Sequence, residues 1–111
     1  AVPGQLNRHY AAPPPEALHY YAREGFELVR LPFRWERAQP ELAGPLSEDY
    51  VGLIDDVVGT AGERGLKVVI SAHQYGRRRQ NRQGHIIGES DVVRSDHFAD
   101  FWRRLARRYR E

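Results

Sequence analysis

Two polar residues stand out in this sequence because each interrupts or ends an otherwise apolar run of strand length. Arg30 lies inside the run FELVRLPF at 26–33, and His73 ends the run LKVVISAH at 66–73. A guanidinium within a sheet is costly unless acceptors meet it, and the second run contains no acid. Arg30 therefore either packs its stem and extends its head to the strand end, or orients a catalytic carboxylate. His73 is either a hydrogen-bonded structural residue or a member of an active site.

Aromatic residues follow both apolar runs within a few positions. Trp35 comes after the first run and Tyr75 after the second. Exposed rings beside a cleft can stack on the apolar faces of sugars or on nucleic-acid bases. The alternative is that both rings pack at the rim of the cleft, and the sequence leaves the two interpretations open.

No spacing typical of a metal or cofactor site is present. The five histidines lack ligand spacing and the chain has no cysteine, which argues against a zinc site and excludes disulfides. The sequence also has no phosphate-binding loop, no dinucleotide fingerprint and no Gly-flanked Ser nucleophile. We therefore expect neither a metal nor a cofactor.

Three amphipathic helices are predicted around the two strands. The second helix begins at Ser47, a good N-cap, and its apolar residues recur at offsets 0, 3, 4, 7, 8 and 11. The third begins at Ser95 and repeats the same offsets. The first follows the proline run 13–15, because Pro suits the first helical turn. The predicted order is therefore helix, strand, helix, strand, helix.

The chain also contains an internal repeat. Aligning Gly25 with Gly65 superimposes REGFELV on ERGLKVV at a period of 40 residues, and such a unit of strand plus helix is typical of parallel α/β folds. In these folds the carboxyl ends of the strands carry the functional residues. Under this alignment Arg30 and His73 have opposite parity. Because barrel layers come from alternate strands, both side chains can still face the interior.

The charge is unevenly distributed along the chain. Residues 1–72 contain seven basic and ten acidic residues, whereas residues 73–111 contain ten arginines and five acids. Four of these arginines cluster in the predicted loop 74–94, where binding residues are common: Arg77, Arg78, Arg79 and Arg82. One hypothesis is a small Arg-rich α/β module that binds nucleic acid or another polyanion. The other is a solvated helix face in an arginine-rich protein.

The length limits what the chain can be. Its 111 residues are too few for a complete enzyme barrel of about 250 residues. No apolar run approaches the roughly 20 residues of a membrane span, so we expect no membrane partner. The first residues show no basic segment leading into an apolar one, so no signal peptide is expected in this chain.

Three segments together resemble the first third of a glycoside hydrolase family 5 enzyme, most of all its endo-β-1,4-glucanase (cellulase) branch. They are GFELVRLPFRWERAQP, LSEDYVGLIDDVVGTAGERGLKVVISAHQYGR and HFADFWRRLARRY. The resemblance implies that residues 1–111 are an N-terminal segment of a (β/α)8 TIM barrel, from the loop after strand one through helix three. It also implies a secreted, retaining β-glycosidase acting on a β-1,4-glucan or related polysaccharide. A mannanase- or xylanase-type barrel hydrolase shares these motifs and stays open.

The resemblance also implies roles for individual residues. Arg30 matches the arginine that hydrogen-bonds the nucleophilic carboxylate, and His73 matches the active-site histidine near the sugar that is cleaved. The implied glycan-contacting residues are Trp35, Gln74, Tyr75, Arg77, Asn7 and Tyr10. The acid/base and nucleophile glutamates would lie beyond Glu111, so the chain alone is expected to be inactive without the remainder of the barrel.

Overall fold

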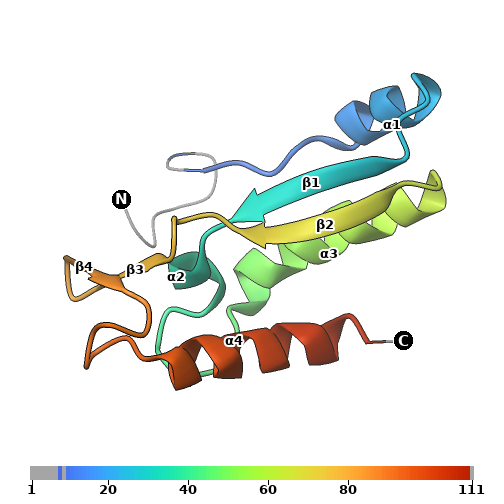
Figure 1. The fold of residues 1–111 in the computed structure, drawn as a ribbon. Helices are drawn as coiled ribbons and strands as arrows, with labels where there is room; N and C mark the ends of the chain where they lie inside the picture. Colours follow the sequence, from blue (N-terminus) through green and yellow to red (C-terminus); the bar gives the residue numbers. More distant parts are fainter. Residues whose placement is uncertain (1–7, 9, 111) are drawn as a thin grey trace.

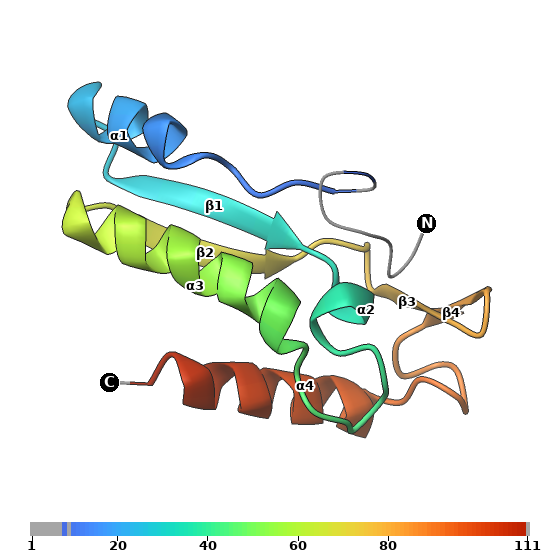
Figure 2. The ribbon, with the colours of Figure 1, turned by 180° about the vertical axis from the view of Figure 1, so that it is seen from behind.

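The computed structural model describes residue 8 and residues 10–110, and its core is a two-stranded parallel sheet with helices packed on one face (Figures 1 and 2). The sheet consists of β1 (Leu28–Phe33) and β2 (Lys67–Ala72). The long helices are α1 (Pro15–Arg23), α3 (Glu48–Glu63) and α4 (Ser95–Arg108). The short elements are α2 (Trp35–Ala38), β3 (Arg77–Gln80) and β4 (Gln83–Ile86). No helix in the described part of the chain is long and apolar enough to cross a membrane.

The five predicted elements are all present, and their helix signals are largely confirmed. Ser47 caps α3, because its Oγ accepts a hydrogen bond from the Tyr50 backbone N–H at 3.4 Å. Pro15 is the first residue of α1, as the proline run predicts. The predicted cap at Ser95 is wrong by one residue. Arg94 occupies the N-cap of α4, where its backbone N–H donates to His97 Nδ1 at 3.0 Å.

Three short elements lie in segments predicted to be loops. A single-turn helix, α2, follows β1, and an antiparallel hairpin of β3 and β4 follows β2. Asn81 and Arg82 join the two hairpin strands, and both have positive φ, 51° and 68°. This backbone is typical of the tight turn that suits the twist of a two-stranded ribbon. The sequence hides the hairpin because Arg82 stands where glycine is usual.

The register of the sheet corrects the parity inferred from the repeat. Arg30 pairs with Val69, a separation of 39 residues rather than 40, because two residues lead from Gly25 into β1 and one leads from Gly65 into β2. Side chains alternate between the faces of a strand. Arg30 therefore shares one face with Val69 and Ser71, and the backbone of His73 continues the pairing through a bond from its N–H to the Phe33 carbonyl at 2.9 Å.

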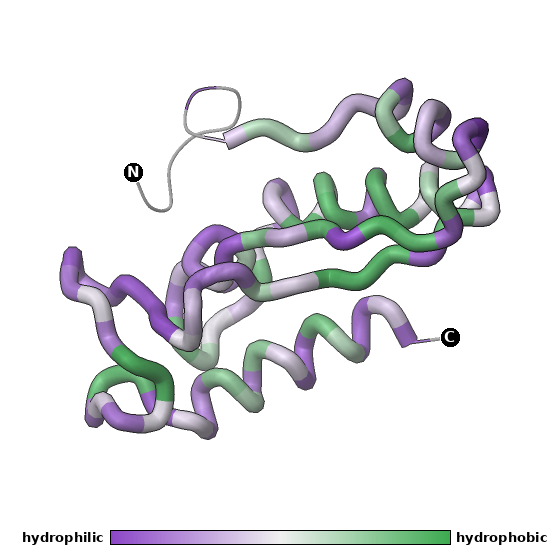
Figure 3. The backbone as a smooth tube through the Cα atoms, turned by 45° about the horizontal axis from the view of Figure 1, so that its top comes forward, coloured by the Kyte–Doolittle hydropathy of each residue, from purple (hydrophilic) through white to green (hydrophobic). Residues whose placement is uncertain are grey.

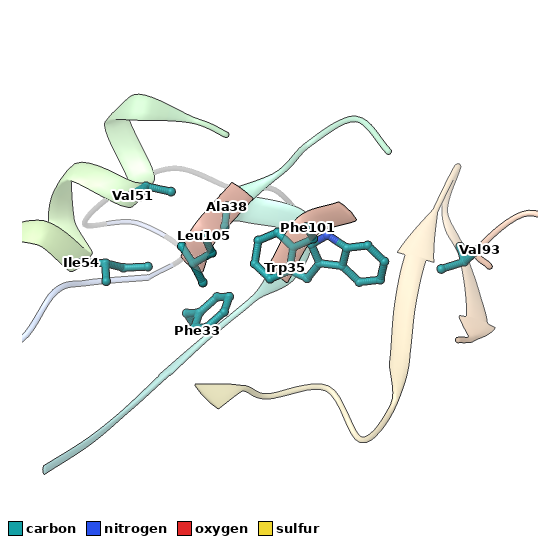
Figure 4. Close-up of a cluster of buried hydrophobic side chains, with 8 residues drawn as sticks. All are labelled: Phe33, Trp35, Ala38, Val51, Ile54, Val93, Phe101 and Leu105. Atoms are coloured by element: carbon teal, nitrogen blue, oxygen red, sulfur yellow. The ribbon is translucent and has the colours of Figure 1, made fainter. Parts of the chain in front are cut away.

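One face of the sheet is buried and the other is open. The buried face packs on α3 and α4 through a core that includes Phe33, Val51, Ile54, Phe101 and Leu105 (Figure 4). On the open face, the side chains of Leu28 and Val69 are 53% and 47% exposed. Parallel sheets are usually covered on both faces. The described residues therefore form one side of a larger parallel architecture.

Candidate active site

Arg30 lies on the open face of the sheet, and its guanidinium is exposed. Its Nη2 donates to Ser71 Oγ on the neighbouring strand at 3.1 Å. Among the described residues, no carboxylate forms an ion pair with Arg30. The Arg30 guanidinium thus bonds a neutral hydroxyl. Its other N–H groups can donate to a carboxylate from another segment of a longer protein.

His73 stands at the carboxyl end of β2, one residue beyond the strand. Its ring is exposed, and it lies 5.3 Å from the ring of Tyr75, centroid to centroid. Tyr75 is 88% exposed and has a φ of 55°. A residue other than glycine in this left-handed conformation carries backbone strain of about 1 kcal/mol or more. The turn thus presents an aromatic face to solvent directly beside His73.

A cavity of about 240 Å³ adjoins His73 at the carboxyl end of β1. Tyr10 lines it and packs edge-on against Tyr50, with 5.2 Å between the ring centroids. The Arg37 guanidinium lies 4.4 Å from the centre of the Tyr10 ring. Much of the lining is apolar and includes Leu31, Leu53, Ile54 and Val57. The structure therefore brings Tyr10 and His73, which are distant in sequence, to one cavity.

Trp35 is not the exposed ring that the sequence suggested. It is 2% exposed and belongs to the core, where its ring lies 5.3 Å from Phe98 and 5.7 Å from Phe101. Its Nε1 donates to Gln39 Oε1 at 2.9 Å, which satisfies the indole N–H inside the core. The physical reason is the single helical turn of α2, which directs the Trp35 ring toward Phe98 and Phe101 of α4. The ring therefore packs in the core and not at the rim of a cleft, which is where the alternative interpretation placed it.

Gln74 links three segments around the site. In the amide orientation that satisfies both neighbours, its Nε2 donates to Glu36 Oε2 at 2.7 Å and its Oε1 accepts from Arg34 Nη1 at 2.9 Å. Glu36 Oε2 also accepts from the Arg79 backbone N–H at 2.9 Å. The Gln74 side chain thus connects the end of β1, α2 and the hairpin.

Arg77 and Arg78 point in opposite directions from β3. Arg77 is exposed, whereas Arg78 is fully buried and lies 4.5 Å from the centre of the Trp35 ring. Arg78 Nη2 donates to the carbonyls of Gln39 and Pro40 at 2.8 and 3.0 Å. Burial lowers the pKa of Arg78, and the nearby Glu36 carboxylate partly offsets this effect. Arg78 therefore anchors the hairpin to α2.

Sequence reasoning missed Glu36 and Arg78 as structural members of the site. Glu36 is 3% exposed, and its Oε1, like Arg78 Nη1, has no partner among the described residues. The spacing of inward residues in a hairpin could have identified Arg78, but only once the hairpin itself was recognised. Asn7, the remaining predicted glycan contact, lies outside the described residues.

Comparisons with known proteins decide the family. The model of the family described as cellulase (glycosyl hydrolase family 5) matches residues 5–111. The chain belongs to glycosyl hydrolase family 5. Endo-beta-1,4-glucanase B of Emericella nidulans is 29% identical over 106 residues, and endo-beta-1,4-glucanase A of the same organism is 32% identical over 107. Each match covers 96% of this chain and 30% of the relative. The chain thus spans about 30% of the length of these relatives.

Solved family 5 structures agree with the fold in detail. Endoglucanase Cel5A of Pseudomonas stutzeri, solved with cellobiose, is 35% identical with a TM-score of 0.89 and covers 99% of this chain. The endo-beta-1,4-glucanase Xac0029 of Xanthomonas axonopodis pv. citri is 37% identical with a TM-score of 0.86 and covers 96%. This chain covers 32% of each of them. The predicted α/β class and the partial (β/α)8 barrel are therefore confirmed.

Proposed function

We propose that the chain is the N-terminal part of a retaining endo-β-1,4-glucanase, from the loop after the first barrel strand through the third helix. The observation that carries the proposal is that Arg30 lies on the open face of the sheet, bonded to Ser71 of the neighbouring strand, and that His73 directly follows the carboxyl end of that strand. Arg30 has no carboxylate partner among the described residues. In support, related solved endoglucanases were crystallised with cellobiose and with cellopentaose.

The proposed mechanism divides the chemistry between this chain and the remainder of the barrel. A retaining glycosidase needs two carboxyl groups about 5–5.5 Å apart, one as nucleophile and one as acid/base. We assign both to segments outside this chain. Arg30 would donate hydrogen bonds to the nucleophile and favour its charged form, because an adjacent cation lowers a carboxyl pKa. His73 would lie beside the sugar that is cleaved.

The substrate contacts are proposed on residues that the family resemblance implies. Tyr75 would stack on a pyranose face beside His73. The other proposed glycan contacts are Arg77, Tyr10, Asn7 and Gln74. Hydrogen bonds to Glu36 and Arg34 hold the Gln74 side chain in place. Trp35 is better assigned to supporting the loop, because its ring is buried. We further propose that the longer protein is secreted.

The test compares the 111-residue chain with the longer protein that would contain the remaining barrel. The longer protein should release reducing sugar from a soluble β-1,4-glucan with retention at the anomeric carbon, and the chain alone should release none. Clear turnover by the chain alone would contradict the proposal that both catalytic carboxylates lie outside it. Assays on xylan and mannan in parallel distinguish the related hydrolases, and faster turnover of either would reassign the substrate.

The Arg30→Gln substitution in the longer protein sharpens the assignment. It removes the cation beside the proposed nucleophile, so kcat should fall by about tenfold or more and the acidic limb of the pH profile should move to higher pH. Arg107→Gln, on the exposed side of α4, is the matched control and should leave kcat and the pH profile unchanged. An unchanged pH profile in Arg30→Gln would contradict the role of Arg30.

A further inference from the structure

The exposed arginines of the hairpin differ from Arg104 and Arg108 of α4 in having no ion pair with a carboxylate in the described part of the chain. On and before α4, Arg94 pairs with Asp96, Arg104 with Asp100, and Arg108 with Asp55 and Glu48. Among the described residues, no carboxylate forms an ion pair with the exposed hairpin arginines, which are Arg77, Arg79 and Arg82. The segment 73–88 contains no acid at all. The hairpin is thus a local excess of positive charge. Much of the backbone tube at this end of the molecule is coloured as hydrophilic in Figure 3.

The hairpin fixes the direction of these arginines. Arg78 points inward to Trp35, so by the alternation of a strand Arg77 and Arg79 point outward. Their cross-strand neighbours are Ile86 and Gly84, which place no acid opposite them. The buried bond from the Arg79 N–H to Glu36 and the anchor of Arg78 hold the backbone of β3 in place. We call the side chains of Arg77, Arg79 and Arg82 the outward arginine face.

The outward arginine face adjoins the proposed glycan path. Arg77 follows Tyr75 by two residues, and Tyr75 lies beside His73. Figure 1 shows the hairpin at the end of the sheet where both strands carry their arrowheads. A polymer that stacks on Tyr75 would therefore extend over these guanidinium groups.

We propose that the outward arginine face binds carboxylate groups carried by the glucan, so that the substrate class is an anionic, carboxylate-substituted β-glucan. Guanidinium groups match carboxylates with two parallel hydrogen bonds. Arg77 and Arg79 lie two residues apart on one face of β3, a spacing that suits charges repeating along a chain, and Arg79 also donates through Nη2 to the Arg82 carbonyl at 3.0 Å. This inference rests on the proposed function, because it names the substrate of the same site.

The experiment uses affinity electrophoresis of the 111-residue chain in gels containing a soluble glucan polymer. Carboxymethylcellulose is the anionic probe, hydroxyethylcellulose the neutral probe, and an oligothymidylate tests nucleic acid. The variant is Arg77→Gln with Arg79→Gln. The matched control is Arg107→Gln with Arg110→Gln, which removes the same charge from exposed positions at the end of α4. Unfolding midpoints of both variants confirm an unchanged fold.

The hairpin variant should lose about tenfold of its affinity for carboxymethylcellulose at low salt, and added salt should erase the difference. Affinity for hydroxyethylcellulose should not change, and the control should lose less than about twofold on either polymer. An equal loss in the control would overturn the inference in favour of net charge alone. The protein could instead bind oligothymidylate as tightly as carboxymethylcellulose and lose that binding in the hairpin variant. This result would overturn the inference in favour of a nucleic-acid ligand.

The inference and the proposed function fail in different ways. Equal binding of both polymers, unaffected by the hairpin variant, sinks the inference and leaves the glucanase proposal standing. Hairpin-dependent binding of carboxymethylcellulose, combined with a longer protein that hydrolyses no β-glucan, removes the proposed function instead. Absence of binding to either polymer contradicts the inference.

Discussion

The same residue type, arginine, plays two roles in two regions of this molecule. On α4, arginines meet carboxylates, as where Arg108 spans Asp55 and Glu48 on α3. On the β3–β4 hairpin, the exposed arginines have no acid opposite them. The difference teaches that an arginine count alone does not indicate binding. What matters is whether the fold supplies a carboxylate within reach.

The α4 contacts hold two helices together on the covered face of the sheet. Arg108 hydrogen bonds hold the pKa of Asp55 below its usual value, although burial works in the other direction. The Tyr109 hydroxyl donates to the same carboxylate at 2.7 Å, and burial raises the pKa of Tyr109. These bonds join α4 to α3, so Arg108 serves stability.

Arg78 should show the largest stability effect within this comparison. Arg78→Ala removes the stack on Trp35 and the donors to Gln39 and Pro40, leaving buried carbonyls unmet, and should lower the free energy of unfolding by about 3 kcal/mol. Urea denaturation measures the change. The neighbouring Arg77→Ala is the control and should change stability by less than about 0.5 kcal/mol. Equal effects would contradict the inward and outward assignment.

Arg108 should show an intermediate effect. Its side chain is partly exposed, so Arg108→Ala should cost about 1 kcal/mol of unfolding free energy, less than a fully buried pair. A double-mutant cycle with Asp55→Ala isolates the contact, and a coupling near zero would contradict the proposed link between α3 and α4. High salt should reduce the coupling.

Acid should weaken the contacts that the carboxylates make with the α4 arginines. Hydrogen bonds from Arg104 lower the pKa of Asp100, as those from Arg108 lower that of Asp55. Depressed folded pKa values contribute stability that is fully present above the unfolded carboxyl pKa of about 3.9 and is lost as pH falls through the folded values. Urea midpoints should therefore fall below about pH 4. In Asp55→Asn the drop should be smaller, and an identical drop would exclude Asp55 as a contributor.

Much of the fold was predictable because its signals are local. The apolar stripe of α3, the Ser47 cap and the glycines after α1 and α3 all act within a few residues. The register was not predictable from the repeat. It depends on one extra residue in the connection before β1, which shifts the pairing from 40 to 39.

The site was predictable only where its residues interrupt a pattern. Arg30 and His73 stand out against apolar runs, and the structure places Arg30 on the open face of β1 and His73 directly after the neighbouring strand β2. Trp35 gives the same sequence signal as Tyr75, yet one ring is 2% exposed and the other 88%. The direction of each ring depends on the turn that carries it. In the sequence Arg78 is one of four arginines in a predicted loop. Only the strand alternation of the hairpin shows that its side chain is buried.

The most direct test of the central claim is a titration of the 111-residue chain with cellopentaose, followed by NMR. The claim is that the carboxyl end of the β1–β2 sheet forms one part of a glucan site. Shift changes should concentrate at His73, Tyr75 and Arg30, and Tyr75→Ala should abolish most of them, while α4 resonances stay in place. Changes confined to α4, or an unchanged response in Tyr75→Ala, would contradict the account.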